Sequence, residues 1–363
     1  MVKSPSGKKP PSARQQADAR SRPASPRLRD VADHAGVHIS TASRALDPLK
    51  EKRISADVAA KVKASARALG YQGNVIAASL RRRRSHTVGV IVPDLTNPMF
   101  PPMFRGIEDR LQQIGYSALL TNSDFNLERE WQLLDMFVKR QVDGLILATA
   151  RLDDPIVTAA QERGMTVVLM NRATADATVP AILADEAAGI GAAVAHLHAL
   201  GHRHIAHIAG PQDVSTGRTR KDAFVAAAAR HGLEAGPRHI VVASQFSEAA
   251  GHRAALHLLQ SGPAPTAIVA ANDALALGVY DALAELNLAC PSDVSVTGFN
   301  DMPFVDRLKP ALTSVRIPQY RMGYEAADEL AARLDGGARP IAHRVLPPKL
   351  MVRDSTGPVR QSA

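Results

Sequence analysis

The sequence predicts an α/β protein in which a small all-α head precedes a larger body of doubly wound parallel sheets. From Thr87 to Thr297, short apolar runs alternate with longer helical runs, as in parallel sheets covered by helices. Residues 28–72 carry only short helical patterns. Residues 1–84 hold 19 Lys and Arg against 6 Asp and Glu, whereas the remainder holds 25 against 29. A basic head on a mildly acidic body indicates a polyanion-binding module joined to a second function.

The head begins with two helical runs separated by Gly36. The first run places four apolar residues at helical spacing: Leu28, Val31, Ala32 and Ala35. The second extends from about Ser40 to Leu46, with Val37, Ala42 and Leu46 expected to be buried. Its outward side chains are His38, Ile39, Ser40, Thr41, Ser43 and Arg44. Such a face suits a helix-turn-helix that reads the DNA major groove, although an ordinary pair of surface helices fits the pattern equally well.

A third helix follows the polar loop at 47–53. Ser55 is its candidate N-cap, apolar residues recur at helical spacing to Leu69, and Gly70 ends it. Residues 28–72 are therefore expected to form the DNA-binding domain. Residues 1–27 are rich in Pro, Ser, Lys and Arg and are predicted to be disordered, either as a passive tail or as a weak electrostatic contributor to DNA affinity.

Residues 73–86 are predicted to be a hinge helix and linker. Asn74 can cap a helix of about two turns that ends near Leu80, ahead of four consecutive arginines at 81–84. A helix this short is marginal in water, so we expect it to form when DNA and a partner copy stabilise it. The arginines are either a solvated linker or a phosphate-contacting element.

The body is predicted to have two similar halves. Residues 88–92 form a continuous apolar run, typical of a strand buried on both faces. Too many strand–helix units follow for one sheet, and residues 171–180 are expected to cross between the halves. Sheets of this kind bind ligands at the carboxyl ends of their strands. The body is expected to end at Val352, with a tail at 353–363 that lacks the leucine heptads of a tetramerising helix.

Other functional classes lack the residues that they need. The single Cys290 fits a reducing cytoplasm, no apolar run approaches a membrane span, and the N-terminus has no secretory apolar core. Five histidines between 196 and 207 straddle a helix end, a turn and a strand, so they cannot all face one metal. The dinucleotide fingerprint, the P-loop and the nucleophile elbow are absent from the sequence. We therefore expect no metal, no cofactor and no enzyme activity.

Together these residues resemble the lactose-repressor/galactose-repressor (LacI/GalR) family of bacterial transcription regulators, from about Leu28 to Val352. The blocks that carry the resemblance occur in the family's order: Asp30-Val31-Ala32-x-x-Ala35-Gly36-Val37 with Thr41-x-Ser43-Arg44; Gly70-Tyr71 before Asn74-x-x-Ala77-x-Ser79-Leu80; Val88-Gly89-Val90-Ile91-Val92-Pro93-Asp94-x-x-Asn97-Pro98-x-Phe100; Val142-Asp143-Gly144-Leu145-Ile146-Leu147; Leu200-Gly201-His202-Arg203-His204-Ile205; Ala271-Asn272-Asp273-x-x-Ala276-x-Gly278; and Gly298-Phe299-Asn300-Asp301 with Pro310-x-Leu312-Thr313.

The resemblance implies a homodimer that binds pseudo-palindromic double-stranded operator DNA, with a small effector in a two-lobed body like that of periplasmic sugar-binding proteins. It implies base reading by Ile39, Ser40 and Arg44, and phosphate contacts by Thr41, Ser43 and Arg53. Leu80 would insert into the minor groove with Ala77 beside it, and His38 and Asn74 complete the implied DNA-binding set.

For the effector, the resemblance implies six residues: Phe100, Asn171, Arg220, Phe246, Asn272 and Asn300. Amides, a guanidinium and aromatic faces suit a hydroxylated molecule such as a sugar or sugar derivative. Three residues depart from the family's pattern: Arg27 at the first N-cap, Asp47 where Asn is usual, and Asn300 where Asp is frequent. The last departure is expected to leave Arg220 without a carboxylate partner, which would favour an acidic ligand such as a sugar acid.

The sequence thus predicts a cytoplasmic, dimeric repressor that is controlled by an effector. A solute-binding protein without a regulatory role predicts an export signal and no basic head, and neither prediction fits. A sugar-processing enzyme predicts a nucleophile or paired carboxylates at strand ends, where this sequence places amides and an arginine. The sequence leaves open the effector, the operator, and whether the effector induces or co-represses.

Overall fold

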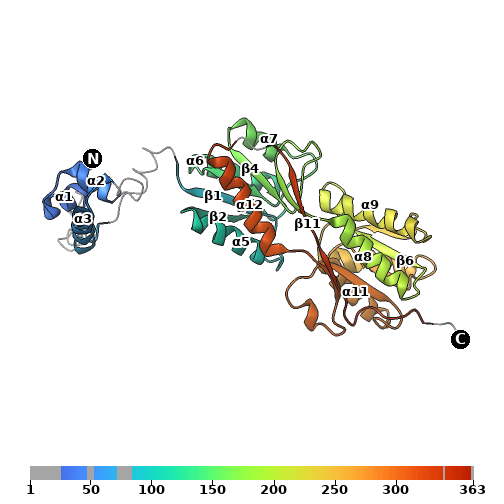
Figure 1. The fold of residues 1–363 in the computed structure, drawn as a ribbon. Helices are drawn as coiled ribbons and strands as arrows, with labels where there is room; N and C mark the ends of the chain where they lie inside the picture. The colour runs from blue at the N-terminus through green and yellow to red at the C-terminus, as the bar shows by residue number, and fades with distance from the viewer. Residues whose placement is uncertain (1–25, 47–52, 72–83, 338–339, 361–363) are drawn as a thin grey trace, which may run out of the picture. The chain divides into compact units, whose positions relative to one another are not determined.

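A computed structural model describes residues 26–46, 53–71, 84–337 and 340–360 of the chain. These residues fall into two units, one before Arg83 and one from Arg84 onward, each described here by itself (Figure 1). Predictions for the tail at 1–25, for Asp47 and for the segment 72–83, which includes Asn74, Ala77 and Leu80, lie outside the described residues.

The first unit consists of helices α1 (Leu28–Ala35), α2 (Ile39–Ala45) and α3 (Ala56–Ala68). The buried side chains are small, since six of the eight are alanines and the other two are Val31 and Val62. Ala45 belongs to this core although the sequence pattern did not select it, while Val37 and Leu46 are only partly buried at its edge. Gly36 ends α1 in the left-handed region (φ 61°), as its position in the turn predicts.

Capping of the first unit's helices differs in part from expectation. At α1 the backbone N–H of Arg27 donates to the Asp30 carboxylate at 2.7 Å. The reciprocal bond of a capping box does not form, because a guanidinium has no acceptor. At α2 the cap is His38, whose Nδ1 accepts from the backbone N–H of Ser40. Ser55 stands at the N-cap of α3 without a side-chain bond to the helix.

The second unit contains two six-stranded sheets. The first has the order β11-β5-β4-β3-β1-β2, and all its neighbouring pairs are parallel. Its strands are β1 (Thr87–Val92), β2 (Ser117–Asn122), β3 (Gly144–Leu147), β4 (Thr166–Met170), β5 (Ala181–Ala184) and β11 (His343–Leu346). Its helices are α5 (Phe100–Gln113), α6 (Leu127–Lys139), α7 (Pro155–Glu162) and α12 (Gln319–Leu334).

The second sheet has the order β12-β10-β9-β8-β6-β7 and is parallel except for the β10–β12 pair. Its strands are β6 (Ile205–Ala209), β7 (Ile240–Val242), β8 (Ala267–Ala270), β9 (Ser295–Asn300), β10 (Thr313–Arg316) and β12 (Lys349–Met351). Its helices are α8 (Glu186–Ala199), α9 (Ser215–Arg230), α10 (Glu248–Gln260) and α11 (Asp273–Glu285). The prediction of doubly wound parallel sheets is confirmed.

The predicted crossing at 171–180 is wrong. β5 follows this loop and still pairs with β4 in the first sheet. The chain crosses after β5, where Asp185 leads into α8, and it returns between β10 and α12, since α12 packs on α5 and β4. A third crossing joins β11 to β12. The two lobes are therefore linked by three segments, a topology that a single sequential crossing does not give.

Residues 353–360 are part of the second lobe, although the sequence analysis assigned them to a tail. The Ser355 side chain is fully buried, its Oγ donates to the Val296 carbonyl at 2.6 Å, and it accepts from the Thr313 backbone N–H at 2.7 Å. Val359 donates its backbone N–H to Leu200 at 3.1 Å. This segment is held at the beginnings of β9 and β10 by polar contacts, so hydrophobic periodicity did not reveal it.

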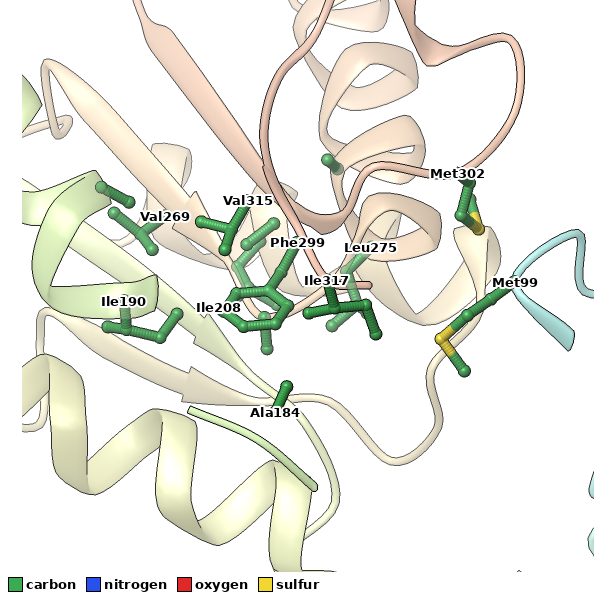
Figure 2. Packing of buried hydrophobic residues seen from close by; sticks show 14 of the residues in the cluster. Met99, Ala184, Ile190, Ile208, Val269, Leu275, Phe299, Met302, Val315 and Ile317 are labelled. Atoms are coloured by element: carbon green, nitrogen blue, oxygen red, sulfur yellow. The ribbon is translucent and has the colours of Figure 1, made fainter. Parts of the chain in front are cut away.

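Alternate side chains of the first sheet's strands fill two apolar layers, one on each face of that sheet. In β1, Val88 and Val90 face the cluster that includes Met103 of α5, whereas Ile91 faces the cluster with Leu134 and Phe137 of α6. In the second lobe, Phe299 of β9 lies among Ile208, Val315 and Ile317 (Figure 2). Because β9 is buried along its whole length, the position of its C-terminal end is held firmly by this packing.

Helices α5 and α12 cross in close contact at two glycines. A Cβ on Gly323 would stand 1.8 Å from the Met103 carbonyl oxygen, and one on Gly106 would stand 2.1 Å from the Tyr320 carbonyl oxygen. These neighbours are backbone atoms, which cannot move without moving a helix.

We predict that Gly323→Ala lowers the free energy of unfolding of the body by about 1–3 kcal/mol, because it overpacks the helix contact. The matched control is Gly191→Ala in α8, where the nearest atom to the new Cβ is the end of the Arg230 side chain at 3.5 Å. At this position the higher helix propensity of alanine should raise the free energy of unfolding by up to about 1 kcal/mol. Urea unfolding of both variants measures the difference, and equal midpoints would contradict the close-contact account.

Candidate functional site

The exposed face of α2 is the first candidate site. Ile39 is 42% exposed, an unusual position for a large apolar side chain, and Arg44 is exposed five residues later. Ser40, Thr41 and Ser43 are half-buried on the same short helix, while Ala42 and Ala45 hold its other face in the core. The helix thus presents an apolar group, hydroxyls and a guanidinium to solvent, as a major-groove reader requires.

The structure places six of the predicted DNA-binding residues on α2 and its N-cap: His38, Ile39, Ser40, Thr41, Ser43 and Arg44. Arg53 is exposed just before α3, whereas Asn74, Ala77 and Leu80 lie outside the described residues. His38 has a structural contact as well, because its Nδ1 lies 2.8 Å from the Ser40 hydroxyl oxygen. Its role at DNA remains a prediction.

The second candidate site is a cleft in the body, lined by residues of both lobes. Its lining residues follow strands or begin helices of both lobes: Pro93, Asn97, Met99, Phe100, Phe125, Asn171, Arg172, Thr216, Arg220, Phe246, Asn272 and Asn300. All six residues of the predicted effector set are among them. They meet because parallel strands present their carboxyl ends at one edge of each sheet.

Arg220 is paired with a buried carboxylate at the base of the cleft. Its Nε donates to Glu186 Oε2 at 2.5 Å and its Nη2 to Glu186 Oε1 at 3.1 Å. Nη1 donates to the Ala271 carbonyl oxygen at 2.6 Å, and the guanidinium carbon lies 3.9 Å from the centroid of the Phe299 ring. Burial raises the pKa of Glu186, and the charge of Arg220 opposes that shift.

The expectation that Asn300 leaves Arg220 without a carboxylate partner is therefore wrong. Glu186, the first residue of α8, supplies the carboxylate, and Asn300 Oδ1 lies 3.5 Å from Nη2 as a weaker acceptor. Sequence reasoning missed Glu186 because its partner lies 34 residues away in the sequence and no local pattern links the two. The inference of an acidic ligand from a free Arg220 has no basis in this geometry.

The asparagine side chains in the cleft differ in which hydrogen-bonding groups they can offer a ligand. Asn272 uses its Oδ1 to cap α11, where it accepts from the Leu275 N–H at 2.9 Å, so its NH₂ group is what it can offer a ligand. Asn171 has a buried Oδ1 with no partner among the described residues. Phe100 and Phe246 supply apolar faces. This set can bind a molecule that both donates and accepts hydrogen bonds around an apolar ring face.

Arg172 also lines the cleft, and sequence reasoning missed it. Its side chain follows β4 directly after Asn171 and is 7% exposed. Nη1 donates to the Thr149 carbonyl oxygen at 3.3 Å, whereas the buried Nε has no partner within the described part of the chain. Burial lowers the pKa of Arg172 to about 10, so it remains charged at neutral pH. Its position immediately after a buried strand was the available signal.

Asp273 holds the loop that carries Asn300. Its fully buried carboxylate accepts from the Ser314 hydroxyl at 2.5 Å and from the Met302 backbone N–H at 2.7 Å. The backbone is left-handed at Asn300 and Asp301, with φ of 106° and 52°. Such positions are rare for residues other than glycine and persist only when surrounding contacts hold them. Burial raises the pKa of Asp273 to about 7.

The histidines between 196 and 207 have separate partners. His196 bonds to Thr356, His202 to Thr266 and the Gly357 carbonyl, and His207 to the Val269 carbonyl. Within the described ranges, no three His, Cys, Asp or Glu side chains are grouped so that they could hold a metal ion. Likewise, none of the described helices is long and apolar enough to span a membrane.

We predict that Glu186→Gln lowers the free energy of unfolding of the body by about 3–5 kcal/mol, because it leaves the buried Arg220 charge without its counterion. The control, Glu162→Gln at the exposed end of α7, is expected to change it by less than about 0.5 kcal/mol. Urea titration of both variants checks this. A loss at Glu186 as small as that of the control would show that the ion pair adds little.

The pKa of Asp273 gives a prediction about pH. A folded-state pKa of about 7, above the ordinary value of 3.8, means that stability contributed by the protonated form is lost as pH rises toward 7. Wild-type protein should therefore lose stability relative to Asp273→Asn between pH 5 and pH 7, by up to about 1.4 kcal/mol per pH unit. Unfolding measured across this window tests it, and a difference that is constant with pH would refute it.

Comparison with known proteins identifies related sequences for both units. Residues 27–74 match "Bacterial regulatory proteins, lacI family", and residues 194–356 match "Periplasmic binding protein-like domain". The chain is 33% identical over 330 residues to the ribose operon repressor of Escherichia coli K12, covering 90% of this chain and 99% of that protein.

Solved structures of similar proteins support the same family assignment. A lac repressor dimer bound to operator and the anti-inducer ONPF superposes with a TM-score of 0.80 at 26% identity, covering 92% of this chain and 99% of that one. A LacI family regulator from Enterococcus faecium with bound ribose superposes with a TM-score of 0.66 at 29% identity, covering 76% and 100%. The resemblance inferred from the sequence is thus confirmed, and the chain belongs to the lacI family of bacterial regulatory proteins.

Proposed function

We propose that this chain is a transcriptional repressor that binds operator DNA through α2 and is controlled by a small hydroxylated ligand in the cleft. The observation that carries the proposal is the match to the ribose operon repressor, which covers 99% of that protein and therefore includes both the DNA-reading unit and the ligand-binding body. A solute-binding protein without a regulatory role would not account for the match at residues 27–74.

On the DNA side, Arg44 can donate two bonds to guanine, while Ile39 and Ser40 contact neighbouring bases. Thr41, Ser43 and Arg53 would hold phosphates and set the position of the helix without reading sequence. A single copy of so short a reading helix covers few base pairs. We therefore propose that the chain acts as a homodimer on a pseudo-palindromic operator, as the lac repressor dimer is bound to its operator.

On the ligand side, a sugar or sugar derivative fits the side chains of the cleft. The Asn272 amide can donate, the unpartnered Asn171 Oδ1 can accept, and hydroxyl groups satisfy both. The faces of Phe100 and Phe246 suit the C–H surface of a sugar ring. The Enterococcus faecium relative, which has ribose bound, supports this ligand class.

Ligand binding would change DNA affinity through the segment that joins the two units. We propose that closure of the cleft changes the distance between the two copies of this segment and so determines whether its hinge helices, including Leu80, engage the minor groove. A few kcal/mol suffices for such control, because a two-turn helix is marginal by itself. The protein would act in the cytoplasm and without catalysis, and its similarity to the ribose operon repressor supports this role.

We predict that Arg44→Ala lowers affinity for the preferred DNA site by about tenfold to a hundredfold and relaxes the preference at one base pair of each half-site. Thr41→Ala should instead weaken binding to all sequences alike. The preferred site is first selected from a random duplex pool with the full chain. Fluorescence anisotropy at one fixed salt concentration then compares the variants.

The charge-matched control is Arg105→Ala on the body, whose exposed side chain pairs with Asp109 at 3.1 Å. Its DNA affinity should equal that of the wild-type chain. Failure of the full chain to enrich any sequence would refute the proposed function, whereas enrichment that Arg44→Ala leaves unchanged would refute only the assignment of Arg44.

A further inference from the structure

The cleft contains two buried guanidinium groups that differ in how their charges are compensated. Arg220 has a bidentate partner in Glu186, at 2.5 and 3.1 Å. Arg172 has only the neutral Thr149 carbonyl, at 3.3 Å, and its Nε has no partner among the described residues. A buried cation without a counterion is unfavourable, so a compensating group is expected from elsewhere.

The nearby carboxylates do not supply it. Asp213 favours the charged form of Arg172, but its side chain is exposed to water, and no ion pair joins the two. Glu130 is engaged by Arg151, whose Nη1 and Nη2 lie 3.1 and 3.4 Å from its oxygens. The charges of Arg151 and Arg220 act against Arg172 in turn. Among the described residues, therefore, no carboxylate forms an ion pair with the buried Arg172 guanidinium.

The remaining walls of the cleft reinforce this positive character. None of the described residues that line it carries a carboxylate, and four of them are asparagines. The N-terminal ends of α5 and α11 also point their partial positive charge toward the cleft, since Phe100 and Asn272 at those ends are lining residues. A neutral sugar would satisfy the hydrogen bonds of this site but would leave the charge of Arg172 buried and unpaired.

We propose that the effector of this protein carries an anionic group, a carboxylate or a phosphate on a hydroxylated carbon chain, and that this group binds Arg172. The inference rests on the proposed function, since it names the ligand class of the same cleft. It differs from the reasoning that started from Arg220, whose charge Glu186 already neutralises. Arg172 determines specificity here: the amides and Arg220 contact the hydroxylated part, while Arg172 selects for charge.

Matched ligand sets test the proposal. Isothermal titration of the full chain compares D-ribose with D-ribonate and ribose 5-phosphate, and D-glucose with D-gluconate and glucose 6-phosphate; inorganic phosphate is the minimal anion. A charge-assisted pair predicts that at least one anionic member binds about tenfold or more tightly than its neutral parent. Comparison of the sugar acids with the sugar phosphates shows whether the site prefers a carboxylate or a phosphate.

Variants then assign the effect to Arg172. Arg172→Gln should reduce the preference for the anion to within about threefold, and Arg172→Lys should keep part of it, because lysine retains the charge. The matched control is Arg218→Gln, which removes an exposed arginine of α9 in the second lobe that bonds to the Gln212 carbonyl outside the cleft lining. It should leave the preference unchanged. Urea unfolding without ligand verifies that the body of each variant is folded.

Two results would overturn the proposal. One is a neutral sugar that binds as tightly as its anionic derivatives, with Arg172→Gln weakening the binding of all of them alike. Arg172 would then donate hydrogen bonds to ligand hydroxyls without selecting for charge, and the proposed function would stand. The other is that none of the anions, including inorganic phosphate, binds at millimolar concentration. If the neutral sugars also fail to bind or to alter DNA affinity, ligand control by sugars fails as well.

Discussion

The buried ion pair between Glu186 and Arg220 fixes the geometry of the ligand cleft. It joins the first turn of α8, where the chain has just left the first sheet, to α9 in the second lobe. Through the Ala271 carbonyl and the Phe299 ring it also contacts the ends of β8 and β9. A buried pair of this kind requires good geometry and further hydrogen bonds to offset the loss of hydration. The Ala271 carbonyl and the Phe299 ring supply these further contacts, and both lie at strand ends that border the cleft.

The sheets supply the rest of the geometry. Every neighbouring pair in the first sheet is parallel, and the second departs only at its edge strand β12, so the loops that follow the strands gather at one edge of each sheet. The left-handed backbone at Asn300 and Asp301 turns Asn300 toward the cleft, and Asp273 holds that turn with two hydrogen bonds. Tight helix contacts at Gly106 and Gly323 brace the first lobe.

Much of this arrangement follows from the sequence. Alternation of apolar strands and helices predicts the parallel sheets, and the resemblance to the family implies the six cleft side chains that the structure brings together. The three-segment linkage between lobes was not predictable, because β5, α12, β11 and β12 join their sheets through long-range pairing. Glu186 was missed for the same reason: its partner lies 34 residues away, and no local pattern links them. The position of Arg172 directly after a buried strand can be predicted from the sequence, but its burial without a counterion cannot.

We propose that occupancy of the cleft controls DNA binding. The decisive measurement is the affinity of the full chain for its selected DNA site, with and without a saturating ligand of the cleft. Coupling of the usual size changes that affinity about 5- to 150-fold, and DNA must change the ligand affinity by the same factor. The direction of the change distinguishes inducer from co-repressor. A ligand that binds in the cleft and leaves DNA affinity unchanged would contradict the account.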